Sequence, residues 1–213
     1  MADTTSAGST TVAPAPAPAN IKGTRTEQRL VMAYISESTA YTRYTYYMQQ
    51  ANKEKLPTIA QIFQATANNE LHHCKVFFKY LQGGQVTVPV TTDAGVIGTT
   101  AENLAIAAAE EQSEGVDEYM LSAQIAREEG FDDIASHFEA IASIEKNHEA
   151  RFRKYLQRLQ DGTLYKRSLP IIWQCLVCGY EYLGTTPPEA CPACNHPQYF
   201  FMPKDEEVSA LAH

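Results

Sequence analysis

The chain has 213 residues, which is long enough for one full hydrophobic core and a small second module. Its residues are 44% hydrophobic and 20% charged, and the formal net charge of −8 argues against nucleic acid as a partner. No apolar run approaches the roughly 18 residues that a membrane-spanning helix needs, so we expect no membrane segment.

Residues 1–20 read MADTTSAGSTTVAPAPAPAN and differ in composition from the rest of the chain. They contain neither the basic region nor the apolar stretch of a secretory signal peptide, so we expect a cytoplasmic protein. The alternation of Ala and Pro predicts a disordered, partly extended arm. We interpret the arm as a tail without a specific role, and a docking segment is the alternative.

Two helices are predicted in the first part of the chain. Thr24 is followed three residues later by Glu27, which is the pattern of a capping box, so the first helix should begin there and end at about Asn52. Pro57 is suited to the first position of a second helix. The glycine pair at 83–84 should end that helix, because glycine readily adopts the left-handed conformation at a helix end.

A long connection and two further helices follow. Residues 85–98, QVTVPVTTDAGVIG, are too many for a tight turn and suit a crossover along a helical bundle. Thr99 and Glu102 repeat the capping-box pattern and predict the start of the third helix. We expect a break near Gly130 and a fourth helix that ends at about Gln160.

The second and fourth predicted helices are copies of each other. A shift of 75 residues places IAQIFQATANNELHHCKVFFKYLQ over IASHFEAIASIEKNHEARFRKYLQ, with Glu70 and His73 on Glu145 and His148. Both copies place Glu-x-x-His on the apolar stripe of the helix, where residues three apart share a face. The sequence therefore predicts a duplicated helical hairpin whose halves are related by a pseudo-twofold axis.

Acidic residues also fall on the apolar stripes of the first and third predicted helices. Taken alone, each of these groups could be an acid at a helix edge or a hydrogen-bonded core histidine. As a set, five carboxylates and two imidazoles converge on one bundle interior, where unpaired charges cost several kcal/mol each. Metal cations would remove that cost. The predicted ligands are Glu37, Glu70, His73, Glu111, Glu114, Glu145 and His148.

This ligand arrangement is that of a ferritin-like carboxylate-bridged dimetal bundle. The expected fold is therefore all-α, a ferritin-like four-helix bundle over residues 21–165 with a long crossover between the second and third helices. Mixed oxygen and nitrogen ligands suit iron or manganese, and zinc could also bind. The shift of 75 pairs Glu37 with Gln112 rather than Glu111, so we expect an irregular turn such as a π-bulge there.

The tail, residues 168–205, contains two Cys-x-x-Cys pairs separated by twelve residues. Cys175, Cys178, Cys191 and Cys194 predict a tetrahedral four-thiolate metal site, and disulfides are the weaker interpretation in a reducing compartment. About 40 residues cannot build a large core, so the metal should fold this module. The spacing leaves structural zinc and redox iron equally open.

Together these motifs resemble the rubrerythrin family, in which a ferritin-like di-iron domain precedes a rubredoxin-like domain. The resemblance extends from about Ile21 to Pro203, and the Ala-Pro arm and Cys74 lie outside the family pattern. It implies two iron ions in the bundle and iron in the four-cysteine site. It also implies that one iron ion moves between Glu114 and His73 as the redox state changes.

The resemblance further implies that Tyr44 and Tyr119 lie beside the dimetal centre. The implied reaction is reduction of hydrogen peroxide to water in oxidative-stress defence. An electron-donating reductase or a rubredoxin would supply electrons to the iron of the tail. A homodimer or higher homo-oligomer is expected. Two alternatives remain: an iron-storage or ferroxidase protein, and a metal-dependent sensor whose tail holds structural zinc.

Overall fold

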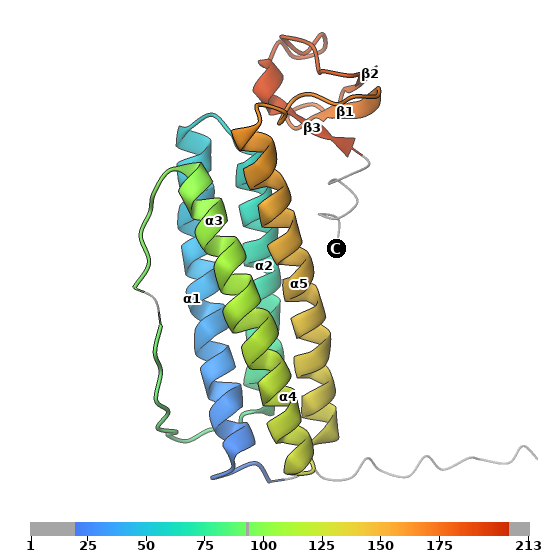
Figure 1. The fold of residues 1–213 in the computed structure, drawn as a ribbon. Helices are drawn as coiled ribbons and strands as arrows, with labels where there is room; N and C mark the ends of the chain where they lie inside the picture. Colours follow the sequence, from blue (N-terminus) through green and yellow to red (C-terminus); the bar gives the residue numbers. More distant parts are fainter. Residues whose placement is uncertain (1–19, 93, 205–213) are drawn as a thin grey trace, which may run out of the picture.

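The computed structural model describes residues 20–92 and 94–204, except for the side chain of Glu114 (Figure 1). The predicted disordered arm lies outside the described residues, apart from Asn20, and stays a prediction. No helix in these described ranges combines the length and the apolar character that crossing a membrane requires.

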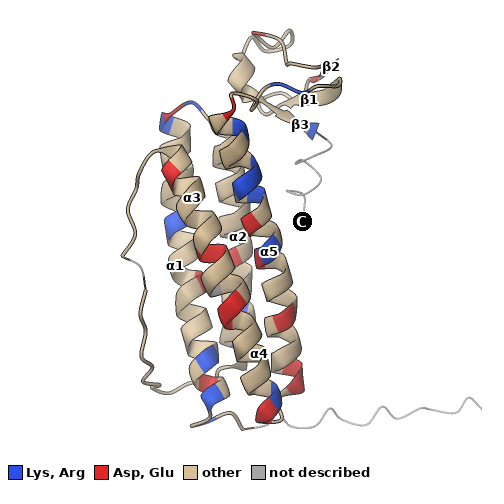
Figure 2. Cartoon of the chain, viewed as in Figure 1, with Lys and Arg blue, Asp and Glu red and all other residues tan. Residues whose placement is uncertain are grey.

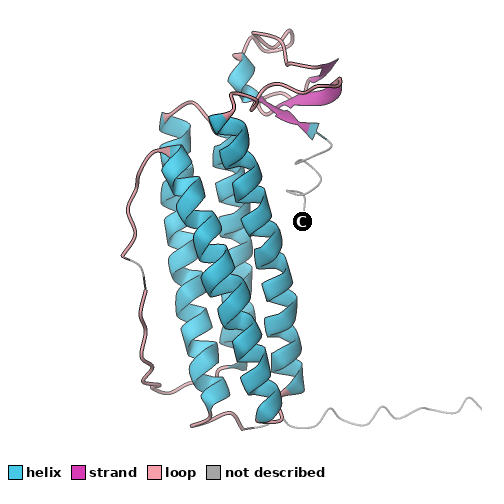
Figure 3. Cartoon of the chain, viewed as in Figure 1, coloured by secondary structure: helices cyan, strands magenta, loops and turns pink. Residues whose placement is uncertain are grey.

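Four long helical rods run side by side and form the bundle that the sequence predicts (Figures 1 and 3). The third rod is continuous but consists of two α-helices with a π-helical segment between them. The helical elements are α1 (Arg25–Lys53), α2 (Pro57–Tyr80), α3 (Thr100–Glu110), η1 (Glu111–Asp117), α4 (Glu118–Glu128) and α5 (Asp132–Gln160).

The helix ends follow from local hydrogen bonds. The hydroxyl of Thr24 accepts a bond of 3.1 Å from the backbone N–H of Glu27, and Thr99 forms the complete reciprocal capping box with Glu102. Gly130, at φ +82°, makes the left-handed turn that separates α4 from α5. The other predicted boundaries are confirmed to within about two residues, but the predicted glycine end of α2 is wrong. That helix ends at Tyr80, three residues before Gly83, because Leu81 is already extended and its N–H bonds to the carbonyl oxygen of Phe78.

The expected irregular turn in the third rod is confirmed as η1. Tyr44 lies seven positions after Glu37 on α1, whereas Tyr119 lies eight positions after the corresponding Glu111. A π-turn contains more residues than an α-turn, so it accommodates the additional residue while both side chains still face the bundle interior. The insertion thus keeps one acid and one tyrosine of each half directed at the bundle interior, where each tyrosine bonds to the acid of the other half.

The crossover, residues 81–99, passes along the outside of the bundle from the end of α2 to the start of α3 (Figure 1). Its described residues form neither helix nor strand. Gly95, at φ +70°, lies against the guanidinium group of Arg43, and a Cβ added there would lie 3.3 Å from Arg43 Nε. The crossover therefore covers part of the α1 surface.

The bundle interior has three levels. An apolar cluster nearer the tail includes the fully buried rings of Tyr44, Phe63 and Phe152, which are 5.3–6.1 Å apart between ring centroids. A second apolar cluster at the other end includes Phe77 and Phe138. The predicted ligand residues lie between these clusters, so two water-poor layers enclose one polar layer.

The tail forms a small three-stranded antiparallel sheet at one end of the bundle (Figures 1 and 3). The elements are β1 (Ile171–Cys175), β2 (Glu181–Gly184), η2 (Gln198–Phe200) and β3 (Phe201–Pro203), in the sheet order β2-β1-β3. The hydroxyl of Thr58 on α2 donates to the carbonyl oxygen of Phe201 at 3.1 Å, and Met202 is buried in the bundle core. The tail is thus packed directly on the bundle.

We predict that Phe63→Ala lowers the free energy of unfolding by about 3–5 kcal/mol, because it removes a fully buried ring from the aromatic cluster. Urea denaturation of the metal-loaded protein measures this loss. Phe78→Ala is the matched control on the same helix, since Phe78 is 57% exposed, and its loss should be below about 1 kcal/mol. Equal losses for the two variants would contradict the assigned core.

Candidate metal centres

The two Glu-x-x-His pairs meet in the middle of the bundle. Glu70 and His73 come from α2, Glu145 and His148 come from α5, and all four side chains are buried. The imidazole rings of His73 and His148 are nearly parallel, with centroids 6.1 Å apart and an angle of 23° between their planes. The structure therefore brings the duplicated motif together as the pseudo-twofold arrangement requires.

Glu70 and Glu145 each direct one carboxylate oxygen toward each histidine. The Nδ1 atom of His73 lies 2.9 Å from Glu70 Oε2 and 2.8 Å from Glu145 Oε1. The Nδ1 atom of His148 lies 3.2 Å from Glu70 Oε1 and 2.7 Å from Glu145 Oε2. A carboxylate whose two oxygens face two ligand groups is suited to bridge two cations.

Glu37 and Glu111 occupy the two outer ends of this cluster. The hydroxyl of Tyr119 donates to Glu37 Oε1 at 2.5 Å, and the hydroxyl of Tyr44 donates to Glu111 Oε1 at 2.7 Å. Each tyrosine comes from the helix opposite its carboxylate. Both tyrosines therefore contact the ligand group through a carboxylate, which fixes the orientation of that carboxylate.

The ligand atoms fall into two groups, in each of which all atoms lie within 4.8 Å of one another. Glu70 and Glu145 belong to both groups. One group is completed by Glu37 and His73, and the other by Glu111 and His148. Glu114 is the one predicted ligand not placed, because its side chain lies outside the described part of the chain.

Burial and crowding shift the proton affinities of these groups in opposite directions. Burial and the nearby charges of Glu145 and Glu70 raise the pKa of Glu37 to about 8, although a hydrogen bond with His73 opposes this. Burial also opposes the ionisation of Glu145, but His148 and His73 outweigh it and lower its pKa to about 2. Burial disfavours a charged His148, yet the Glu70 and Glu145 carboxylates raise its pKa to about 9.

The directions of these shifts indicate that positive charge, from protons or from metal ions, stabilises the cluster. Protons on the imidazoles and on the outer acids offset part of the buried negative charge. Divalent cations would replace those protons, so metal binding releases protons. Two divalent cations carry four positive charges, which equals the charge of the four described carboxylates in the two groups.

The hydrogen bonding of the described residues gives an independent test of this fit. Both oxygens of Glu145, one oxygen of Glu70 and Nδ1 of His148 are buried, and none of them makes a hydrogen bond of acceptable geometry. Buried polar atoms are rarely left without a partner. Because oxygen and imidazole nitrogen are suitable ligands for iron and manganese, the four atoms fit a pair of such ions.

Gly115 is a functional position that the sequence analysis missed. It lies in η1 and is buried against α5, where an added Cβ would be only 2.6 Å from both Cβ and Cγ of Glu145. Only glycine allows this approach, so Gly115 determines how closely Glu145 can lie to the third helical rod. An isolated glycine within a helical pattern can mark a close approach of two chain segments, and the sequence contains this signal at Gly115. The sequence does not show that Glu145 is the residue it approaches.

A charged pair lies beside the ligand group and was also missed. Arg43 on α1 forms an ion pair with Glu110, the residue before Glu111, and both side chains are largely buried. Charged residues are visible along the middle of the helical rods in Figure 2, and this pair adds a cation next to the acidic ligands. The pair closes one side of the cluster, where α1 meets the third rod.

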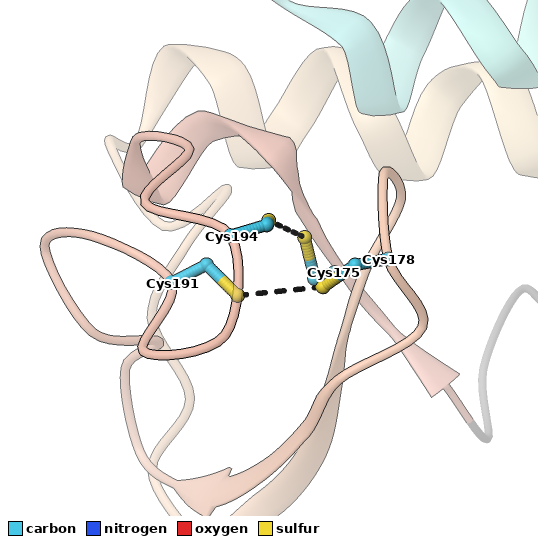
Figure 4. A group of neighbouring side chains, drawn as sticks. All are labelled: Cys175, Cys178, Cys191 and Cys194. Carbon is cyan, nitrogen blue, oxygen red and sulfur yellow. Dashed lines mark hydrogen bonds between the residues drawn. The ribbon is translucent and has the colours of Figure 1, made fainter.

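The four tail cysteines form a second candidate metal site (Figure 4). Cys175 Sγ lies 3.7 Å from Cys194 Sγ, and Cys178 Sγ lies 3.6 Å from Cys191 Sγ. A tetrahedral ion with metal–sulfur bonds of about 2.3 Å places its sulfur atoms about 3.8 Å apart. All five cysteines of the chain lie in the described residues and none forms a disulfide, so the geometry fits a four-thiolate ion.

Backbone amides prepare Cys191 for metal binding. Burial alone raises the pKa of a thiol, but the N–H groups of Ala193 and Cys194 outweigh it and lower the pKa of Cys191 to about 7. A thiol must lose its proton to bind a metal ion, so this shift favours the ligand form near neutral pH. His196 contacts the Cys194 carbonyl oxygen at 3.2 Å and is not part of the ligand group.

Two family profiles match this chain in the order in which the two sites occur. Residues 28–156 match the profile described as Rubrerythrin, and residues 173–202 match the one described as Rubrerythrin, rubredoxin-like domain. The first profile spans more than half of the chain. It contains all the predicted bundle ligands, and the second contains all four cysteines.

Individual relatives and solved structures are similar to this chain over most of its length. A protein of Porphyromonas gingivalis named rubrerythrin is 45% identical over 184 residues, covering 86% of this chain and 92% of its own. A rubrerythrin of Nitratidesulfovibrio vulgaris is 41% identical over 182 residues, covering 85% and 95%. The structure of nigerythrin in a partially reduced state has a TM-score of 0.56 and 25% identity, covering 89% of this chain and 90% of that one. The expected fold class is therefore confirmed.

We predict that Gly115→Ala removes most of the metal from the bundle, because the new methyl group displaces Glu145 from its position between the two histidines. Elemental analysis after iron loading and desalting should show a decrease from about three ions per chain to about one, the latter in the tail. Gln112→Ala, in the same segment but outside the ligand group, is the control and should keep its metal. Full occupancy in Gly115→Ala would show that this close approach is not needed.

Proposed function

Because the chain belongs to the rubrerythrin family, we propose that it reduces hydrogen peroxide to water at two iron ions held by the bundle, with electrons delivered through iron in the four-cysteine site. The observation that carries the proposal is the presence of two different centres in one chain. One is a buried group of carboxylates and imidazoles arranged for two ions, and the other is a group of four thiolates.

The reaction needs two electrons and two protons for each peroxide, and it yields two water molecules. When bound, two ferrous ions supply these two electrons and the positive charge that stabilises the separating oxygen atoms. The chain must hold such a pair at a fixed separation. Glu70 and Glu145 can do so, since each presents one oxygen to each half of the site.

The remaining residues of the centre orient the ligands and exclude water. Tyr119 and Tyr44 donate hydrogen bonds to Glu37 and Glu111, and these bonds favour the charged form of each carboxylate. The apolar clusters above and below the ligand level limit the access of solvent. We propose that His73 and Glu114 alternate as ligands, as the family resemblance implies, while Glu145 stays in place.

The position of the tail suggests how electrons enter. Cys178 is exposed, so a reductase or a rubredoxin can approach the four-cysteine site from solvent. Twelve residues of α2 separate Thr58, which contacts the tail, from Glu70, and this corresponds to about 18 Å along the helix. Electron tunnelling weakens exponentially with distance. We therefore propose a homodimer in which the tail of one chain lies closer to the dimetal centre of the other.

We also propose a cytoplasmic location and a role in oxidative-stress defence. The four cysteines are arranged as metal ligands and form no disulfide in the structure, and a reducing compartment would keep such thiols available for metal. Iron storage is less well supported, because a storage protein has no evident need for a one-electron carrier attached to its bundle.

The test of this proposal separates the two centres. Cys178→Ser removes one thiolate and should empty the tail site, while the bundle keeps its own core and ligands. Steady turnover of peroxide with an external reductase should then fall at least about 100-fold, since electrons no longer reach the bundle. A single oxidation of chemically reduced protein by hydrogen peroxide should keep its rate, because those electrons already reside on the two iron ions.

Cys74→Ser is the matched control for the loss of a cysteine. Cys74 lies on α2, its sulfur is 3.3 Å from Ser38 Oγ, and it belongs to neither ligand group. This variant should keep steady turnover. Steady turnover that survives loss of the tail metal would make the tail structural and the electron-delivery step wrong. Reduced wild-type protein that hydrogen peroxide cannot oxidise would overturn peroxide reduction itself.

A further inference from the structure

A cavity of about 360 Å³ lies between α1, the crossover and the third helical rod. Met32, Ala33 and Ile35 form its apolar side on α1, and Pro89 and Val90 cover it from the crossover. We call this space the crossover cavity. Its volume falls within the range of small-molecule sites.

The crossover cavity adjoins the dimetal centre. A smaller space of about 20 Å³ is lined by the ligand carboxylates, and three of its lining residues, Ser36, Thr39 and Tyr119, also line the larger cavity. Tyr119 is the residue that donates to Glu37 at 2.5 Å. A molecule in the crossover cavity is therefore separated from the metal ligands by no more than this layer of residues.

A second groove, lined by α1 and a later part of the crossover, is less suited to an apolar molecule that must reach the centre. It has a volume of about 490 Å³ and includes Val96 and Ile97. Arg43, which is ion-paired with Glu110, lines both this groove and the small space beside the ligands, and so does Thr39. This groove therefore adjoins the ligand space through one charged and one hydroxyl side chain, whereas the described residues that the crossover cavity shares with that space, Ser36, Thr39 and Tyr119, are all uncharged.

Among the residues that the structure describes, the charged groups that line the crossover cavity favour a neutral occupant. Arg29 and Glu118 line it, and they form an ion pair with an N–O distance of 2.7 Å. Because each charge already has a partner, the pair offers little additional attraction to an acid or an amine. An uncharged molecule with an apolar group fits this lining best.

We propose that this protein also reduces small organic hydroperoxides, whose hydrocarbon group occupies the crossover cavity while the peroxide group faces Tyr119 and the dimetal ligands. This inference rests on the proposed function, because it uses the same iron pair. Cleavage of the O–O bond requires two electrons, which a pair of ferrous ions held by the bundle ligands would supply, and two protons taken up from solvent. The products are the corresponding alcohol and one water molecule.

The first experiment compares two peroxides by stopped-flow oxidation of reduced, iron-loaded protein. Val90→Trp fills the crossover cavity from an exposed loop position, so the bundle core is spared. The rate with cumene hydroperoxide, relative to the rate with hydrogen peroxide, should fall at least about 10-fold. Val96→Trp is the matched control in the same crossover, lining the other groove, and should leave that ratio unchanged.

The second experiment measures binding without a redox reaction. The probe is 2-phenyl-2-propanol, the alcohol formed from cumene hydroperoxide, titrated into the oxidised, metal-loaded protein by calorimetry. It should bind wild type and Val96→Trp equally and bind Val90→Trp at least about 10-fold more weakly. The absence of binding to wild type would overturn the assignment of the cavity, whatever the activity.

The outcomes distinguish this inference from the proposed function. Oxidation by hydrogen peroxide but not by cumene hydroperoxide overturns the inference and leaves the proposed function intact. Oxidation by neither peroxide overturns the proposed function, and the inference is lost with it. A ratio that falls in Val96→Trp rather than in Val90→Trp would place the hydrocarbon group in the other groove and contradict the crossover cavity.

Discussion

The structure depends on the need to neutralise four carboxylates that are buried at one level of a helical bundle. Glu37, Glu70, Glu111 and Glu145 are each no more than 5% exposed. Two histidines cannot offset that charge without taking up protons, and the raised pKa of His148 and the raised pKa of Glu37 show this demand. A pair of divalent cations would neutralise the charge of these four carboxylates. The same residues that would destabilise an empty bundle therefore stabilise a metal-loaded one.

The other parts of the fold position the ligand residues and enclose this polar layer. Duplication of one hairpin supplies each ligand type twice, and the crossover allows the two hairpins to face each other within one chain. The π-helical segment η1 retains the pairing of Glu111 with Tyr44 and brings Gly115 against Glu145. Apolar clusters above and below isolate the level from water, and the tail sheet extends one of them through Met202.

Much of this could be predicted from the sequence, because helical periodicity alone places Glu70 with His73 and Glu145 with His148 on buried faces. The break in register at Gln112 likewise indicated η1 before its geometry was known. Contacts between helices could not be predicted in this way. Helical periodicity shows which residues share a face of one helix, but it does not give the distance between two helices. That distance determines the close approach of Gly115 to Glu145, the Arg43–Glu110 ion pair and the crossover cavity.

The most direct test of the account is a crystal structure of the iron-loaded protein with anomalous diffraction measured at the iron absorption edge. Two iron positions are expected in the bundle, about 3.5–4 Å apart, with Glu70 and Glu145 each bound to both. One further metal position is expected among Cys175, Cys178, Cys191 and Cys194. A fully loaded crystal with a single bundle ion, or with two ions that share neither Glu70 nor Glu145, would contradict the central claim that the buried carboxylates form one bridged dimetal centre.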